Sequence, residues 1–116
     1  MKVSSSHITY EDVTAKRVVF CEGYAMAHNP FFNQLPLVGS KGQILIINAP
    51  ELKLESILKG PIFIAPLGND KYWAGASFEQ EDKSLSITAE GAQWLKDKIE
   101  RMIDVPYTVE KHITHI

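Results

Sequence analysis

The sequence predicts a mixed α+β fold, in which a mostly antiparallel sheet packs against one long helix and one short helix. Short apolar runs rich in β-branched residues alternate with turn residues over most of the chain. One stretch near the C-terminus instead spaces its apolar residues like a helix. The length of 116 residues suits a single domain, and 45% apolar with 22% charged residues is an ordinary globular composition.

The first half of the chain predicts three strands. Residues 2–10 form a weak strand, because they are rich in Ser, Thr and β-branched residues. Residues 17–21 are a short, mainly apolar run that ends before Gly23, as in a strand buried on both faces. Residues 24–40 contain two prolines and predict a loop with one helical turn. Residues 43–47, Gln-Ile-Leu-Ile-Ile, give the strongest strand.

The second half begins with a short helix and a hairpin. The helix is predicted over residues 51–59, because its apolar residues follow a proline and precede a glycine. Residues 61–66 and 71–77 form the two strands of the hairpin, and residues 67–70, Leu-Gly-Asn-Asp, form its turn.

The clearest helix is predicted over residues 89–104, with Thr88 as its N-cap. Its apolar stripe keeps a helical spacing and consists of Ala92, Leu95, Ile99, Met102 and Ile103. Pro106 prevents the helix from continuing. Residues 107–116 then form a last strand, with one face made of Tyr107, Val109 and Ile113.

Composition argues against several classes of function. Twelve basic and fourteen acidic residues give a net charge of −2, without the basic excess of a nucleic-acid-binding protein. No apolar run reaches the length of about 18 residues that a membrane span needs, and the N-terminus has no signal-peptide core. Cys21 is the only cysteine, so no internal disulfide forms, as expected for a cytoplasmic protein.

Few residues have a spacing that supports catalysis or metal binding. His112 and His115 are three apart on a strand and point to opposite faces, so no metal site is expected. Cys21 ends an apolar run and is predicted to be a small buried hydrophobe. The acidic residues within 79–82 are predicted to be solvated loop residues. No catalytic acid or base is predicted.

Two segments could touch a ligand. Residues 39–42, Gly-Ser-Lys-Gly, could hold an anion through backbone N–H groups, but they lead into a strand, which favours a tight loop without a ligand. Aromatic residues cluster around the hairpin, where alternation puts Phe63 and Ala65 on one face. That face is either core, which the spacing favours, or a wall over a planar ligand.

Four segments together resemble the D-amino-acid oxidase and glycine oxidase family of FAD-dependent oxidoreductases. Residues 17–23, Arg-Val-Val-Phe-Cys-Glu-Gly, resemble the strand and small–x–Gly turn beside the flavin nucleotide. Residues 35–44, Leu-Pro-Leu-Val-Gly-Ser-Lys-Gly-Gln-Ile, resemble the entry into the substrate-domain sheet. Residues 63–66, Phe-Ile-Ala-Pro, and 75–79, Gly-Ala-Ser-Phe-Glu, are similar to the extended hairpin. The order of the segments covers nearly the whole chain.

The resemblance implies a fragment of an enzyme in which FAD takes a hydride from the C–N bond of an amino acid or amine. Residues 1–23 would be a strip of the flavin-binding domain. Residues 24–116 would be the substrate-binding (cap) domain, truncated at its C-terminal end. The full-length parent protein would bind FAD, and this fragment alone would not.

The resemblance also implies roles for particular residues. Gly23 and Gly42 would lie beside the cofactor in the full-length parent. Phe63 and Ala65 would line the substrate pocket.

The sequence departs from the family pattern at several points. The N-terminal βαβ unit with its Gly-x-Gly-x-x-Gly fingerprint is missing, and so is the Gly-x-Arg-Pro segment expected after Ile116. Ser77 replaces the usual threonine, and Phe63 stands where a tyrosine is common, which leaves the substrate open. Arg17 and Arg101 are the only arginines, and neither is placed as a carboxylate clamp.

A non-catalytic α+β binding or assembly module is the alternative, and the absent glycine fingerprint favours it. A fragment cut from a larger enzyme would expose the strand at residues 17–21 and the apolar face of the hairpin at residues 61–79. Exposed strand edges and apolar patches associate, so the fragment is expected to form a dimer.

Overall fold

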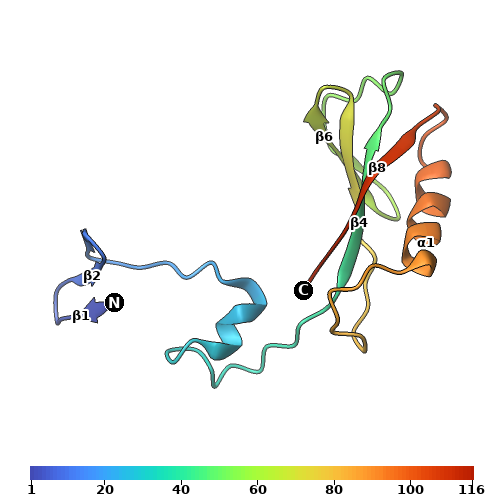
Figure 1. Cartoon of the computed structure of the whole chain (residues 1–116). Coiled ribbons are helices and arrows are strands. Elements are labelled where there is room, and N and C mark those ends of the chain that lie inside the picture. The colour runs from blue at the N-terminus through green and yellow to red at the C-terminus, as the bar shows by residue number, and fades with distance from the viewer. The chain divides into compact units, whose positions relative to one another are not determined.

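The computed structural model describes all residues, 1–116, and confirms the predicted α+β class. The chain divides into two compact units, Met1–Val38 and Gly39–Ile116, each with its own antiparallel sheet (Figure 1). The predicted boundary after residue 23 concerns domains of a longer protein, and it stays a prediction.

The first unit contains three short strands and one short helix. Strands β1 (Lys2–Val3), β2 (Ile8–Tyr10) and β3 (Val13–Ala15) pair in that order as an antiparallel sheet. The predicted strand over residues 2–10 is therefore two strands. The helical turn expected after residue 23 is a 3-10 helix, η1 (Gly23–His28).

The strand predicted over residues 17–21 is wrong, because these residues have no regular structure. No strand of the first unit lies beside them, and an apolar run can become a buried strand only where neighbours hydrogen-bond to it. Val19 is accordingly 83% exposed. Cys21 is exposed as well, so the prediction that it is buried is also wrong.

The second unit is a five-stranded antiparallel sheet with one helix on it (Figure 1). The strands lie in the order β5 (Leu58–Lys59), β6 (Phe63–Gly68), β7 (Lys71–Gly75), β4 (Gly42–Asn48) and β8 (Thr108–His115). The predicted central strand, the hairpin and the last strand are all present, but β6 extends to Gly68, so the hairpin turn is residues 69–70, and β7 ends at Gly75. β4 lies between β7 and β8, so both of its backbone edges are hydrogen-bonded.

The short helix predicted over residues 51–59 is not present. The chain turns after Pro50, and its end forms the edge strand β5, which pairs with β6 through Leu58 and Ile64. Lys53 has a φ of 49°, a left-handed conformation that is incompatible with an α-helix. Leu52, Leu54 and Leu58 are partly buried and pack against the core without forming a helix.

The long helix α1 (Ala89–Glu100) begins and packs as predicted, but it ends four residues earlier than residue 104. The Thr88 side chain caps it by accepting a hydrogen bond from the backbone N–H of Gly91. Leu95 and Ile99 are fully buried. They complete a core whose other members are Leu45, Ile47, Ala49, Ile62, Ile64, Tyr72, Ala74 and Ile103.

A bulge in β8 changes which of its side chains share a face. Lys111 pairs with Ile46 and Val109 pairs with Ile47, so the register skips one residue of β8. Ile113 pairs with Ile44. Because Ile44 and Ile47 lie on opposite faces of β4, Val109 and Ile113 do too. The single face predicted for Tyr107, Val109 and Ile113 is therefore wrong. No helix is long and apolar enough to cross a membrane.

Replacing Leu95 by alanine is expected to lower the free energy of unfolding by about 2–5 kcal/mol, because it leaves a cavity between α1 and the sheet. Urea unfolding followed by circular dichroism measures the change. Gln93→Ala, on the exposed side of the same helix, is the matched control and is expected to change stability by about 0.5 kcal/mol or less. Similar losses in both variants would contradict the packing described for α1.

Candidate functional site

The five-stranded sheet has one face covered by α1 and one face that nothing in its unit covers. The register places Phe63 opposite Gly75 and Ala65 opposite Trp73 on that second face. Ile44 and Ile46 of β4 continue the same two rows across the sheet. We call this surface, made of Ile44, Ile46, Phe63, Ala65, Trp73 and Ile113, the open face.

The open face is apolar. Phe63 is 46% and Ile113 is 40% exposed, whereas Ala65 and Trp73 are half-buried. The Ile44 side chain packs closely against Gly75, because a Cβ at Gly75 would come within 2.4 Å of it. The two residues predicted as pocket wall, Phe63 and Ala65, are therefore brought together on one continuous apolar surface, and they are not part of the core.

The two glycines predicted to contact a cofactor lie in different units. Gly42 belongs to β4 and faces the same side as Ile44. Gly23 begins η1 with a φ of +56°, a conformation that favours glycine, and nothing lies within 4 Å of where its Cβ would be. Space beside Gly23 is therefore open to a ligand, but the conformation alone is enough to explain the glycine.

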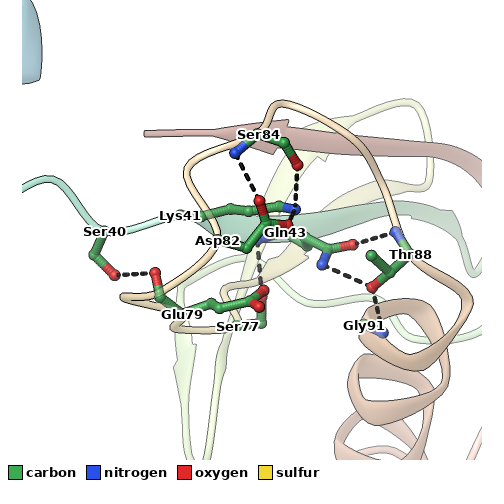
Figure 2. Close-up of polar contacts among 9 residues, drawn as sticks. All are labelled: Ser40, Lys41, Gln43, Ser77, Glu79, Asp82, Ser84, Thr88 and Gly91. Atoms are coloured by element: carbon green, nitrogen blue, oxygen red, sulfur yellow. Dashed lines mark hydrogen bonds and ion pairs between the residues drawn. The ribbon is translucent and has the colours of Figure 1, made fainter.

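A buried ion pair at the start of β4 was not anticipated. The Lys41 side chain is fully buried, and its ammonium lies 2.5 Å from a carboxylate oxygen of Asp82 (Figure 2). The backbone N–H of Ser84 donates to the other oxygen at 2.7 Å. Asp82 therefore holds a buried charge in place, and the prediction of a merely solvated acidic loop is wrong for this residue.

A second buried polar contact joins β4 to the start of α1 (Figure 2). Gln43 is 2% exposed, and its side chain makes two hydrogen bonds with Thr88. Its amide oxygen accepts from the backbone N–H of Thr88, and its amide nitrogen donates to the Thr88 hydroxyl, each at 3.0 Å. The same hydroxyl accepts from the N–H of Gly91. A Cβ at Gly91 would come within 2.4 Å of the Gln43 amide, so a larger residue there would displace this amide from Thr88.

The glycine loop at residues 39–42 is not a free anion cradle. Lys41 pairs its backbone with Glu79, and its ammonium is already used by Asp82. Lys83 donates to the carbonyl of Gly39 from the other side. The favoured prediction, a tight loop that feeds the strand, agrees with these contacts.

The contacts of Asp82 lower its pKa. The hydrogen bonds from Lys41 and then from Ser84 stabilise the carboxylate and lower its pKa from 3.8 to about 2.

The histidines of β8 do not assemble a site. His112 pairs with Leu45 on the helix-covered face and His115 with Gly42 on the opposite one, as their spacing predicts. Burial, and then the charge of Lys96, lowers the pKa of His112. Its Nε2 is buried without a hydrogen-bond partner. The chain contains no cluster of three or more His, Cys, Asp or Glu side chains that could hold a metal ion.

The first unit carries its own apolar surface. Asn29 is its only buried residue up to Val38. The ring centroid of Phe20 lies 5.5 Å from that of Phe32, in an edge-to-face arrangement, and 6.1 Å from that of Phe31, with the two rings tilted. An open cavity of about 400 Å³ lies there, lined by Met1, Val3, Ile8, Val18, Phe20, Phe31 and Phe32.

Comparison with known proteins leaves the family undecided. No protein-family model matches this chain, and no solved structure matches it. The resemblance to the D-amino-acid oxidase family therefore rests on the four sequence segments alone.

Acid is expected to destabilise the second unit through Asp82. Its pKa is lowered in the folded chain, so its contribution to stability is complete above about pH 4 and is lost as the pH falls from 3.8 through about 2. Urea unfolding at a series of pH values measures this loss. Asp82→Asn is expected to remove this part of the pH dependence, and an unchanged pH profile would contradict the pairing.

At neutral pH, Asp82→Asn is expected to destabilise the fold more than Lys41→Met does. Asparagine leaves the fully buried Lys41 ammonium without its counter-ion, whereas methionine fills the same space without a charge and leaves a carboxylate that reaches solvent.

Proposed function

We propose that this chain forms the substrate-binding part of an FAD-dependent oxidoreductase that oxidises the C–N bond of an amino acid or related amine. One observation carries the proposal. Phe63 and Ala65, which the resemblance assigns to the pocket wall, share an uncovered apolar face of the sheet with Trp73 and Ile44. One face of the sheet is packed, and the other is apolar and uncovered. An exposed apolar face of this kind usually marks a site where a partner binds. In the proposed enzyme, the flavin ring and the substrate fill this role.

The chemistry of the open face suits hydride transfer. An apolar wall excludes water from the reacting carbon and from the flavin ring. The titratable side chains on this face include Lys111 and His115, which both belong to the edge strand β8. FAD itself would supply the oxidising chemistry when bound. The chain's own residues would orient the substrate, with Phe63 and Ala65 in contact with it.

The flavin nucleotide would be held mainly by a glycine-rich βαβ unit that residues 1–116 do not contain. In the proposed enzyme, Gly23 and Gly42 allow close approach of the backbone to the cofactor. Residues 17–21, which are mainly apolar and mostly exposed here, would gain strand neighbours from the flavin-binding part. We also propose that this enzyme is located in the cytoplasm.

The test uses the protein that carries this chain in its natural reading frame. We expect the purified protein to contain FAD and to reduce it anaerobically when an amino acid or amine is added. Phe63→Asp places a charge on the apolar wall and is expected to raise KM at least about tenfold with little change in flavin content. Ile57→Asp, at an exposed apolar position outside the sheet, is the control.

Two results would contradict the proposal. One is a natural protein that contains no flavin. The other is an equal effect of Phe63→Asp and Ile57→Asp on substrate oxidation, which would show that the open face does not contact the substrate.

The second candidate is a non-catalytic α+β binding or assembly module. The exposed apolar residues of both units favour it, because contiguous apolar patches beyond a few hundred Å² usually mark interaction sites. This candidate needs no cofactor, so a flavin-free natural protein would support it.

Self-association is expected from the same surfaces, whichever candidate holds. We expect the chain of residues 1–116 to form dimers through residues 1–23 or the hairpin at residues 61–79, measured by sedimentation velocity at increasing concentration. Phe63→Asp or Val19→Asp, whichever lies in the contact, is expected to weaken the dimer, because burying an unpaired charge is costly. A chain that remains monomeric at high concentration would rule out this association.

A further inference from the structure

A cavity of about 510 Å³ lies beside the beginning of α1, in the second unit. Its lining comes from β4, from the chain that follows β7 and from the first two turns of α1, and consists of Gln43, Ser77, Phe78, Glu79, Thr88, Glu90, Gly91 and Trp94. This volume is within the range of small-molecule sites. The lining includes no residue of the open face, so it is a separate site from the one proposed above.

The floor of the cavity is fixed by contacts already made. Gln43 and Thr88 bond each other, and the Thr88 hydroxyl accepts from Gly91 (Figure 2). These groups therefore offer few free donors to an anion. They hold the walls in place, and recognition of a ligand depends on the other side chains of the lining.

Two aromatic side chains provide the apolar part of the walls. Phe78 is 74% and Trp94 is 41% exposed, so both rings leave apolar surface uncovered. The Trp94 ring already has a cation over it, since the Lys98 ammonium lies 5.0 Å from its centroid. One face of this ring therefore already holds a cation, and a ligand would meet the ring with its apolar part.

The charge of the lining is negative. It contains Glu79 and Glu90 and no basic residue. Glu90 lies in the first turn of α1, where the partial positive charge of the helix end offsets it. The half-buried Glu79 makes no ion pair and no side-chain hydrogen bond, because its contacts with Ser40 and Lys41 use only its backbone. Lys41 is neutralised by Asp82 and cannot balance it.

We propose that this cavity binds an organic ammonium ion that carries an aromatic or branched apolar group. The ammonium pairs with the carboxylate of Glu79, and the apolar group lies against Phe78 and Trp94. The carboxylates alone would attract any cation, but the cavity and the two rings select one with an apolar body.

The experiment uses the ¹⁵N-labelled chain and phenethylammonium as the probe. The chain has two tryptophans, and each reports on one face: Trp94 lines the cavity and Trp73 lies on the open face. Trp94→Phe assigns their indole N–H signals. We expect the Trp94 indole and the Gly91 amide to shift with a Kd of about 1–10 mM, as for other ligands of this size.

Two comparisons test whether the ion pair with Glu79 contributes to binding. The neutral analogue 2-phenylethanol and the variant Glu79→Gln are each expected to weaken binding about threefold or more, as loss of an ion pair does. Glu81→Gln, an exposed glutamate of the same loop outside the lining, is the matched control and should bind like the original chain.

The inference would be overturned by no shift of Trp94 or Gly91 at about 20 mM probe, by equal binding of the neutral analogue, or by no effect of Glu79→Gln. Shifts confined to Trp73 would also overturn it, and they would instead favour amine binding at the open face. The proposed function and this inference can therefore fail separately.

Discussion

The alternation of side chains along β4 is the constraint on which the second unit depends. β4 is hydrogen-bonded on both edges, by β7 and β8, so its residues must satisfy a sheet with two distinct faces. Every second residue from Lys41 to Ala49 is buried on the side that α1 covers. Leu45 and Ile47 lie at the centre of this row, and Leu95 and Ile99 of α1 belong to the same core. Ile44 and Ile46, which alternate with these buried residues, belong to the open face.

The same alternation buries polar residues at the start of the strand and thereby fixes the loop beside it. Lys41 and Gln43 continue the buried row, and each needs a partner because an unpaired polar group in the interior is costly. Asp82 partners Lys41, and Thr88 partners Gln43 (Figure 2). The segment that joins β7 to α1 is thus held at two points, and the second of them is the N-cap of the helix. The pair of contacts therefore also positions Thr88 for helix capping.

Two surfaces of the second unit remain without a partner, and each has a different chemical character. The open face is apolar and has the lysine of β8, Lys111, at its margin. The cavity beside α1 combines the rings of Phe78 and Trp94 with the carboxylate of Glu79. The proposed enzyme uses the first surface for the flavin and substrate. The proposed ammonium ligand in the cavity would lie against α1 and β4, on the side of the sheet opposite the open face.

The sequence by itself determined the α+β class, the strand at β4, the hairpin and the start of α1, because periodicity and turn residues act over a few neighbouring positions. It also placed Phe63 and Ala65 on one face. Tertiary structure decided the rest. The apolar run at residues 17–21 has no neighbouring strand to join, and Lys53 breaks the helix expected after Pro50. Extending the alternation of β4 backwards would have signalled the burial of Lys41, but its partner 41 residues away becomes apparent only once the chain is folded.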